Sequence, residues 1–387
     1  MTIIQPNGSM GLLGHNKLRQ TVDNEMPNFM EELAKVDEAD ERLNAALFRD
    51  FSMLSSAYLL EGCHINYLNT KSQGEGEYGI GMDHLPEKIA MPMKFTADRI
   101  RYGQPLLEYA YGYALNNWKL KDDKNPDSLN YVNDELYPEI GAPITSGIEL
   151  IRKFHGSESE AGFVLIHVVI DSKTHLLTAA HKLMMEGARK KDREMMNKGL
   201  KQHLDTLDTM NEIFKKIWTV SAPKDYLEFR TFIMGIQGND DIFPNGVLYK
   251  GVSDKPQAYR GETGAQDSII PSIDNAFGLD YPRNSLTEYL FQMRAYRPYN
   301  HQQYINSLRS EQLATGQKAF ALEDTYSTFL MLQNIHGTFK FRHQHWGMVK
   351  KYIIDNIKYP RATGGTPITT WLPNQIGACL EQCQVFV

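Results

Sequence analysis

Apolar residues recur at helical spacing along most of this chain. Within residues 30–57, side chains three, four or seven positions apart form an apolar stripe among charged residues: Leu33, Val36, Leu43, Leu47, Phe51 and Leu54. This spacing is typical of amphipathic helices, because 3.6 residues per turn bring such positions to one face. Similar patterns occupy residues 144–155, 158–190, 192–219, 224–235, 266–278, 285–296, 313–357 and 367–383. The chain is therefore predicted to be mainly helical.

A polar segment interrupts this pattern near residue 120. Apolar periodicity disappears over residues 119–138, where charged residues, asparagine and Pro126 dominate. Just before it, an aromatic-rich stretch follows Pro105, a residue suited to the first turn of a helix, so we expect a helix to begin there. A chain of 387 residues is long enough for two domains. We predict a small N-terminal domain over residues 1–120, a connecting segment over 121–140 and a large domain over 141–387.

His345 is the first candidate for chemistry. It continues an apolar stripe with Phe341, Met348 and Tyr352, whereas His343 points away and is expected at the surface. A histidine facing apolar side chains from a helix is what an axial haem ligand requires, although a hydrogen-bonded core histidine has the same pattern. The glycine-rich residues 362–367 follow closely and could fold over a small polar substrate.

Two further polar residues lie in apolar surroundings. His167 is flanked by apolar residues throughout 163–170; this octet alone reads as a strand, but its continuation over about thirty residues favours a helix. A buried imidazole there needs a hydrogen-bond partner or a chemical role. Arg230 borders an apolar stripe, so it either pairs at the surface with Glu228 or Asp225, or binds a substrate carboxylate in two parallel hydrogen bonds. The irregular residues 235–266 form a long loop of the kind that often carries function.

Composition limits the partners and the location. The net charge is −6, with no long run of lysine or arginine, so nucleic acid and anionic membranes are not expected partners. The N-terminus lacks a signal-peptide pattern, and no uninterrupted apolar run reaches the roughly 18 residues needed to cross a bilayer. Cys379 and Cys383 are expected to be reduced thiols, and no Cys-x-x-Cys-His motif is present for thioether-linked haem. We expect a cytoplasmic protein.

Several segments, in this order, resemble the indoleamine and tryptophan 2,3-dioxygenases, and the indoleamine branch more closely. They are residues 85–92, 105–118, 162–170, 229–239, 246–251, 259–268, 345–353 and 363–366, with motifs such as Leu85-Pro86, Asn117-Trp118, Gly162-Phe163, Tyr259-Arg260-Gly261 and Thr363-Gly364-Gly365-Thr366. The resemblance implies an all-α protein in which a small N-terminal helical domain packs on a larger helical bundle. It also implies that the bundle binds haem b non-covalently.

The resemblance carries roles to individual residues. His345 would be the proximal ligand of the haem iron, with its other ring nitrogen held by a hydrogen bond. The distal pocket would include Phe163, His167, Arg230, Thr263, Gly264, Thr363 and Gly364. Arg230 would hold the substrate carboxylate, and Thr363 with its glycines would close over the amino-acid end. Tyr226 and Tyr109 also fall near the pocket, although in each the spacing to the next matched segment differs by one residue.

The implied activity is that of a haem-dependent dioxygenase. Both atoms of O2 would be inserted at the C2=C3 bond of L-tryptophan or a related indoleamine, which gives N-formylkynurenine. His167 departs from the closer branch, which typically has serine there, and is similar to the tryptophan-dioxygenase branch; it could accept the indole N–H hydrogen bond. Two alternatives remain: a haem monooxygenase of a tryptophan-like compound, and a haem or gas-sensing protein without turnover. The resemblance leaves the oligomeric state open.

Overall fold

A computed structural model describes residues 1–71, 76–121, 147–357 and 362–383. The α-helices are α1 (Leu18–Glu25), α2 (Met30–Leu33), α3 (Glu41–Lys71), α4 (Glu87–Arg99), α5 (Glu158–Asp171), α6 (Thr174–Lys190), α7 (Arg193–Lys215), α8 (Ile217–Val220), α9 (Pro223–Arg230), α10 (Ile269–Ala276), α11 (Ser285–Gln292), α12 (Tyr299–Thr315), α13 (Gln317–Leu322), α14 (Thr325–Tyr352) and α15 (Ile368–Cys383). The strands are β1 (His84–Leu85), β2 (Trp118–Leu120), β3 (Ile148–Leu150) and β4 (Leu248–Tyr249). Short helical turns are η1 (Tyr109–Tyr113), η3 (Thr231–Ile233), η4 (Gly264–Gln266), η5 (Met293–Tyr296) and η6 (Ile354–Asn356).

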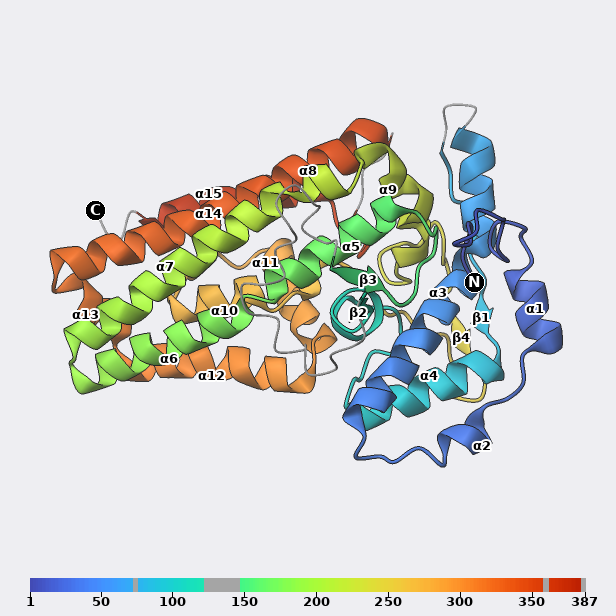
Figure 1. The fold of residues 1–387 in the computed structure, drawn as a ribbon, viewed down its shortest axis with the longest axis horizontal. Helices are drawn as coiled ribbons and strands as arrows, with labels where there is room; N and C mark the ends of the chain where they lie inside the picture. The colour runs from blue at the N-terminus through green and yellow to red at the C-terminus, as the bar shows by residue number, and fades with distance from the viewer. Residues whose placement is uncertain (72–75, 122–146, 358–361, 384–387) are drawn as a thin grey trace.

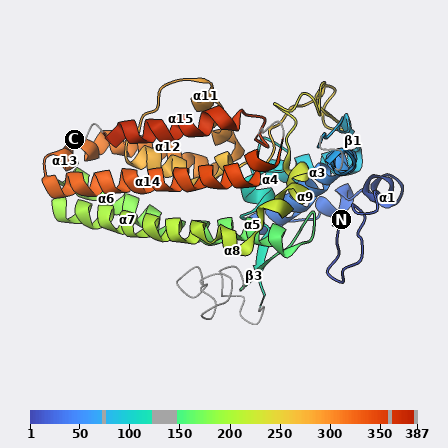
Figure 2. The ribbon, with the colours of Figure 1, turned by 90° about the horizontal axis from the view of Figure 1, so that it is seen from above.

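Long helices form a bundle that makes up most of the molecule (Figure 1). Helix α7 packs against both α6 and α14, and α14 packs in turn against α15. Seen from above, α6, α7, α12, α14 and α15 run roughly along the same axis (Figure 2). Their facing sides are closed by fully buried side chains such as Met184, Leu200 and Met331. The predicted all-α fold is confirmed.

The N-terminal elements α1 to α4 gather at one end of this bundle, on the right in Figure 1. They are joined to a later part of the chain, because β1 pairs in parallel with β4 through His84↔Leu248 and Leu85↔Tyr249. The loop that follows α9 therefore packs against the N-terminal elements. The predicted connecting segment, apart from residue 121, lies outside the described residues. The division at residues 120 and 141 stays a proposal.

Two helical predictions are wrong. Within residues 144–155, the described part contains β3, which pairs antiparallel with β2 through Glu149↔Lys119. Ile148 and Leu150 are buried on either side of half-buried Glu149, and this alternation suits a strand. No helix begins at Pro105 either, because helix α4 ends at Arg99 and the next helical element is the π-helical turn η1. The buried Glu108 carboxylate starts this turn by accepting backbone N–H bonds from residues 110, 111 and 112.

The apolar run at residues 158–190 is helical, as predicted, but it forms two helices. Ser157 caps α5 by accepting the backbone N–H of Glu160, and the chain turns at Ser172 and Lys173 before α6. By length and composition, Glu158–Lys190 could cross a membrane, but 56% of its most apolar window is buried among other helices. A buried core helix of a globular protein has the same character. This apolar stretch is therefore only weak evidence for a membrane-spanning helix.

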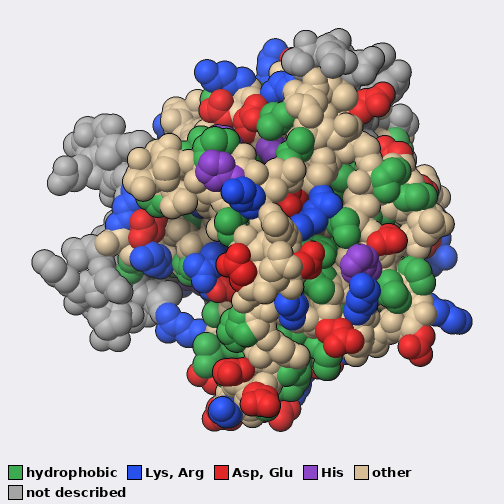
Figure 3. All heavy atoms as spheres, turned by 90° about the vertical axis from the view of Figure 1, so that its right-hand side faces the viewer, with side chains coloured by type: hydrophobic (Ala, Val, Ile, Leu, Met, Phe, Trp, Pro, Cys, Tyr) green, Lys and Arg blue, Asp and Glu red, His purple; other side chains and the backbone are tan. Residues whose placement is uncertain are grey.

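The face formed by the N-terminal end of the molecule carries mixed charges (Figure 3). Lysine and arginine side chains lie between aspartate and glutamate side chains there, and no patch of one sign gathers on this face. A nucleic-acid site would present a basic patch or stripe. On the face shown, the charge distribution agrees with the net charge of −6.

Candidate functional site

Helix α5 carries His167 within a buried stretch. Every residue from 160 to 170 is buried except His167, which is half-buried, so its imidazole keeps contact with accessible space. Its Nδ1 lies 2.8 Å from the carbonyl oxygen of Phe163, one helical turn earlier. The carbonyl can only accept, so Nδ1 carries the proton and Nε2 keeps its lone pair. Burial lowers the pKa of His167, which favours this neutral form.

His345 lies on α14 and interacts with His167. The imidazole is half-buried, whereas His343 is exposed as expected. Burial, with a second contribution from His167, lowers the pKa of His345 to about 4. An electrostatic interaction thus links two imidazoles that lie 178 positions apart in the sequence. The hydrogen bond that we expected to orient His345 is absent among the described residues.

An aromatic wall joins α5, α9 and α14 beside the histidines. The ring of Phe163 lies 5.4 Å from that of His167, 4.8 Å from Tyr226 and 5.7 Å from Tyr352, measured between centroids. Tyr226 also contacts Phe229 at 5.3 Å. Such tilted and edge-on ring pairs are the arrangements that aromatic side chains prefer, so the cluster packs stably. The predicted pair Phe163 and Tyr226 is thus brought together with His167.

Tyr109 closes another side of the same region from the π-helical turn η1. Its ring meets the His167 ring edge-on at 5.8 Å, and its hydroxyl donates to the Asp171 carboxylate at 2.7 Å. Asp171 lies one turn after His167 on α5, and burial followed by the charge of Asp267 raises its pKa well above the usual range. A π-helical turn is often found at functional sites because it redirects side chains.

Arg230 ends α9 and is only 2% exposed. Its Nη1 donates to the Tyr78 hydroxyl at 3.0 Å, while the neighbouring Glu228 pairs with Lys71 at 3.0 Å. Because Arg230 is buried, it does not have the surface position assumed in the first alternative, a pair with Glu228 or Asp225. The Arg230 guanidinium also acts on the hydroxyl of Tyr226, so two phenols, Tyr78 and Tyr226, lie beside it. A buried guanidinium in such surroundings suits an anionic ligand.

The loop at residues 363–365 is fixed to two other loops. The Thr363 hydroxyl donates to the backbone carbonyl of Glu262, and Asn239 Nδ2 donates to the backbone carbonyl of Thr363 at 3.1 Å. Arg260 Nη1 donates to the carbonyl of Gly364 at 2.8 Å. Both Thr363 and Gly364 are buried, so the predicted loop is ordered against its neighbours in this structure.

The predicted residues Thr263 and Gly264 lie at the start of η4. Thr263 caps this turn with its hydroxyl, and the Gln266 side chain returns a bond to the Thr263 backbone. Gln266 also accepts the backbone N–H of Tyr109 at 3.0 Å, which ties η4 to η1. Thr263 is half-buried and Gly264 is exposed. Of the two, only Thr263 lies inside the packed loops.

Gly365 is expected to be needed for this loop arrangement. Its φ is +81°, and a Cβ placed there would lie 2.5 Å from the backbone oxygen of Gly238. Gly365→Ala should therefore destabilise the fold by about 1–3 kcal/mol and weaken substrate binding. Thermal unfolding and ligand titration measure both effects. Gly103→Ala, where a Cβ would meet no atom within 4 Å, is the matched control; equal unfolding midpoints for the two variants would contradict the expectation.

The sequence matches one family model over nearly its whole length. The model described as "Indoleamine 2,3-dioxygenase" covers residues 9–370. The chain belongs to the indoleamine 2,3-dioxygenase family. The resemblance inferred from the motifs is thereby confirmed, and family membership implies haem binding.

Family relatives carry more than one name. Indoleamine 2,3-dioxygenase 1 of Rattus norvegicus is 25% identical over 310 residues, which cover 74% of this chain and 70% of that protein. A 6-hydroxytryptophan 2,3-dioxygenase of Fusarium equiseti is 26% identical over 225 residues, or 56% of this chain and 54% of that protein. A protein named myoglobin from Haliotis madaka is 22% identical over 281 residues, or 72% of this chain and 67% of that protein. Membership in the dioxygenase family therefore leaves the specific activity open.

The residues around His345 fit the haem that the family implies. A neutral imidazole that has no hydrogen-bond partner in the described part of the chain has a lone pair available for iron. A second imidazole, His167, acts electrostatically on His345 and is itself packed against the rings of Phe163 and Tyr109. Within the described residues, no group of three or more histidine, cysteine, aspartate or glutamate side chains is arranged to hold a metal ion. A single histidine ligand is what haem needs, because the macrocycle supplies the other donors.

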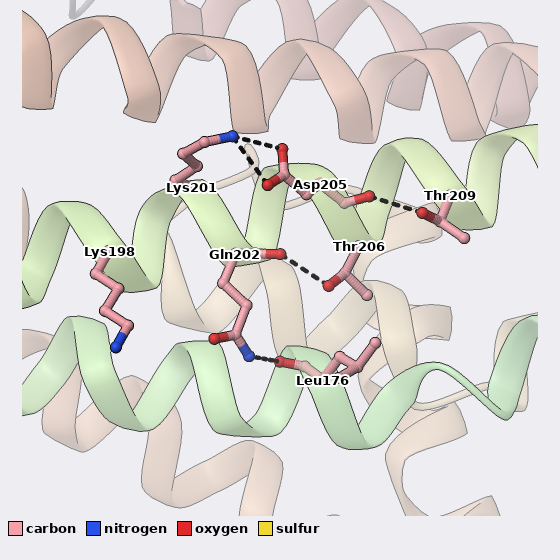
Figure 4. Close-up of a pocket in the computed structure, with 7 residues that line it drawn as sticks. All are labelled: Leu176, Lys198, Lys201, Gln202, Asp205, Thr206 and Thr209. Atoms are coloured by element: carbon pink, nitrogen blue, oxygen red, sulfur yellow. Dashed lines mark hydrogen bonds and ion pairs between the residues drawn. The ribbon is translucent and has the colours of Figure 1, made fainter. Parts of the chain in front are cut away.

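A pocket elsewhere on the bundle has different properties (Figure 4). It lies between α6 and α7, and most of its polar side chains are already engaged in hydrogen bonds or ion pairs. Lys201 pairs with Asp205 at 2.9 Å, and Gln202 donates to the carbonyl of Leu176 at 3.0 Å. No histidine or aromatic side chain lines it. We assign it no part in the chemistry of the family.

Sequence reasoning missed Asp171, Tyr78 and Glu262 near this site. Asp171 could have been noticed, because it lies four residues after His167 on a predicted helix. Tyr78 and Glu262 lie in irregular segments, where no periodicity predicts which side chains turn inward. Their positions depend on contacts between loops that are far apart in the sequence.

Proposed function

We propose that this protein is a haem-dependent dioxygenase that opens the indole ring of L-tryptophan or a related indoleamine. Both oxygen atoms of O2 would be inserted at C2=C3 to give N-formylkynurenine. The main support is that His167, whose ring lies 5.4 Å from that of Phe163, acts electrostatically on His345, which another helix carries. His345 would hold haem b through its iron. Bound haem would supply the iron centre at which O2 is activated.

His167 and Phe163 would orient the indole. Because His167 donates through Nδ1 to a backbone carbonyl, its Nε2 can only accept a hydrogen bond. The indole N–H is a donor without acceptor capacity, so it complements Nε2. The Phe163 ring offers an apolar face for the indole, and fixed orientation of the substrate lowers the entropic cost of reaction. These residues would select the indole end of the substrate.

Arg230 would bind the carboxylate of the substrate. Its guanidinium is buried beside Tyr78 and Tyr226, and two parallel hydrogen bonds from a guanidinium match a carboxylate. Thr363 and Gly364, together with Thr263 and Gly264, would border the amino-acid end. The loops at residues 234–239, 259–264 and 363–365 hold each other through hydrogen bonds from backbone and side-chain donors to backbone carbonyls. This part of the site would therefore be organised before the substrate arrives.

His167→Ser is expected to keep haem bound but to change substrate preference. Loss of one hydrogen bond to the indole should weaken the binding of L-tryptophan by about 0.5–1.5 kcal/mol. The binding of 1-methyltryptophan, which lacks the N–H, should be nearly unaffected. Ligand titrations followed by the haem absorption spectrum measure this difference. His175→Ser is the matched control, since His175 is exposed on α6. Equal losses for the two ligands would remove the proposed contact with the indole nitrogen.

A second function is favoured by the relatives named myoglobin: reversible binding of a gas at haem without turnover. The two functions differ in their products. Haem-loaded protein is reduced without air, L-tryptophan is added, and O2 is then admitted. Ring-opened product, detected by mass spectrometry, supports the dioxygenase. A stable oxygenated spectrum, unaffected by L-tryptophan and without product, supports the second function.

A further inference from the structure

Glu262 is a buried carboxylate to which the proposed function gives no role. Its residue is 7% exposed, and it lies between Gly261 and Thr263 in the loop before η4. The backbone on either side is closely held: Gly261 packs against the backbone of Gly235, and Thr363 donates to the Glu262 carbonyl. The backbone that carries the Glu262 side chain is therefore held in place by neighbouring loops.

The Glu262 carboxylate lacks the partners that other buried glutamates of this fold have. Glu108 and Glu160 each accept three backbone N–H bonds, and Glu61 accepts two. Glu262 has neither a hydrogen bond nor an ion pair to its side chain within the part of the chain that the structure describes. The oxygens of its carboxylate are not completely buried, so a small ligand group could reach them. A buried carboxylate is costly unless it is neutralised or paired.

The surroundings of Glu262 connect it to the substrate region. Burial raises the pKa values of Tyr109, Tyr113, Tyr226 and Tyr289, and the charge of Glu262 contributes to each of these shifts. The Glu262 backbone also accepts the hydroxyl of Thr363, one of the residues expected at the amino-acid end of the substrate. Tyr226 is also within reach of Arg230. Two buried groups of opposite charge, Arg230 and Glu262, thus both influence the pKa of the Tyr226 hydroxyl. Burial, then the charge of Glu108, raises the pKa of Glu262 to about 8.

We propose that Glu262 binds the α-ammonium group of an amino-acid substrate whose carboxylate is held by Arg230. The described residues provide no cationic partner for this carboxylate, and the ammonium group of a substrate would be one. A hydrogen bond between two charged groups is strong in buried surroundings. Together the two residues select zwitterions over indoles that lack either group. This inference rests on the proposed function, because it assumes that an indole amino acid binds beside His167.

Three indole probes separate the two charge contacts. L-tryptophan has both groups, tryptamine has only the ammonium, and indole-3-propionate has only the carboxylate. Haem-loaded protein is titrated with each probe, and the change in its absorption spectrum gives the dissociation constant. Glu262→Gln should weaken L-tryptophan and tryptamine roughly 30-fold and leave indole-3-propionate unchanged or tighter. Glu288→Gln is the matched control, since Glu288 is exposed on α11.

The possible outcomes are distinct. Equal weakening of all three probes by Glu262→Gln, or no weakening of L-tryptophan, would overturn the ammonium contact while the proposed function stands. If no indole probe binds the wild-type protein, both fail together. Thermal unfolding of the variant checks its fold; glutamine is nearly isosteric, and Glu262→Ser gives the same comparison should the first variant unfold. Selective loss of the two amine-containing probes supports the inference.

Discussion

Replacing His345 with glycine is expected to abolish axial ligation of haem. Burial lowers the pKa of the His345 imidazole to about 4, which favours its neutral form, and no hydrogen bond to this imidazole competes within the described residues. Loss of the ligand should reduce the haem content of purified protein roughly tenfold or more, since even disturbing the orientation of a metal ligand costs tenfold to a hundredfold in affinity. The Soret absorbance relative to protein absorbance measures haem content.

Two comparisons make the His345 result specific. His343→Gly removes an exposed histidine from the same helix and should leave haem content unchanged. Added imidazole should restore much of the Soret band to the His345→Gly protein, because it can occupy the space that the side chain leaves. A normal spectrum and full haem content in His345→Gly would show that another residue ligates the iron.

Replacing Arg230 with alanine should have the second largest effect, on binding of the substrate carboxylate. Removing one partner from a buried charge pair costs about 2–5 kcal/mol, which is at least ~30-fold in affinity. L-tryptophan and indole-3-propionate should therefore weaken by this amount, whereas tryptamine should change little. Spectral titration of haem-loaded protein with the three ligands measures the difference.

The Arg230 variant needs a check on folding, because its guanidinium also donates to Tyr78. Tyr78→Phe removes that bond alone and should cost only about 0.5–1.5 kcal/mol in binding. Arg309→Ala, which breaks an exposed pair with Asp280, should leave all three affinities unchanged. If Arg230→Ala weakens tryptamine as strongly as L-tryptophan, Arg230 acts on the fold of the site and not on the carboxylate.

Helical periodicity predicted the bundle but not its interruptions. The break between α5 and α6 falls at Ser172 and Lys173, where the apolar pattern continues without a glycine or proline to mark it. Helix α12 had no predicted counterpart before residue 313, because polar residues such as Asn300 and Gln303 dilute its apolar stripe. Strand β3 is only three residues long, and its pairing with β2 depends on a partner that lies 28 positions or more away. Contacts of this kind are not encoded in local spacing.

Candidate site residues that lie on helices are easier to recognise in the sequence than those that lie in loops. His345 and His167 each stand out against apolar neighbours, and Arg230 was recognised as a candidate because it borders an apolar stripe. Glu262 was not, because its surroundings arise where residues 234–239, 260–264 and 363–365 meet. The sequence shows a charged residue in a glycine-rich loop, and such residues are usually solvated. Only the packed loops reveal that this carboxylate is buried.

The proposed reaction is tested most directly by the fate of isotopically labelled dioxygen. Reduced, haem-loaded protein is mixed with L-tryptophan under 18O2, and the product is measured by mass spectrometry. We predict N-formylkynurenine that contains two labelled oxygen atoms per molecule, and its loss in the His345→Gly protein. A product with a single labelled oxygen would identify a monooxygenase, and the absence of product despite oxygen binding would contradict the assignment of a dioxygenase.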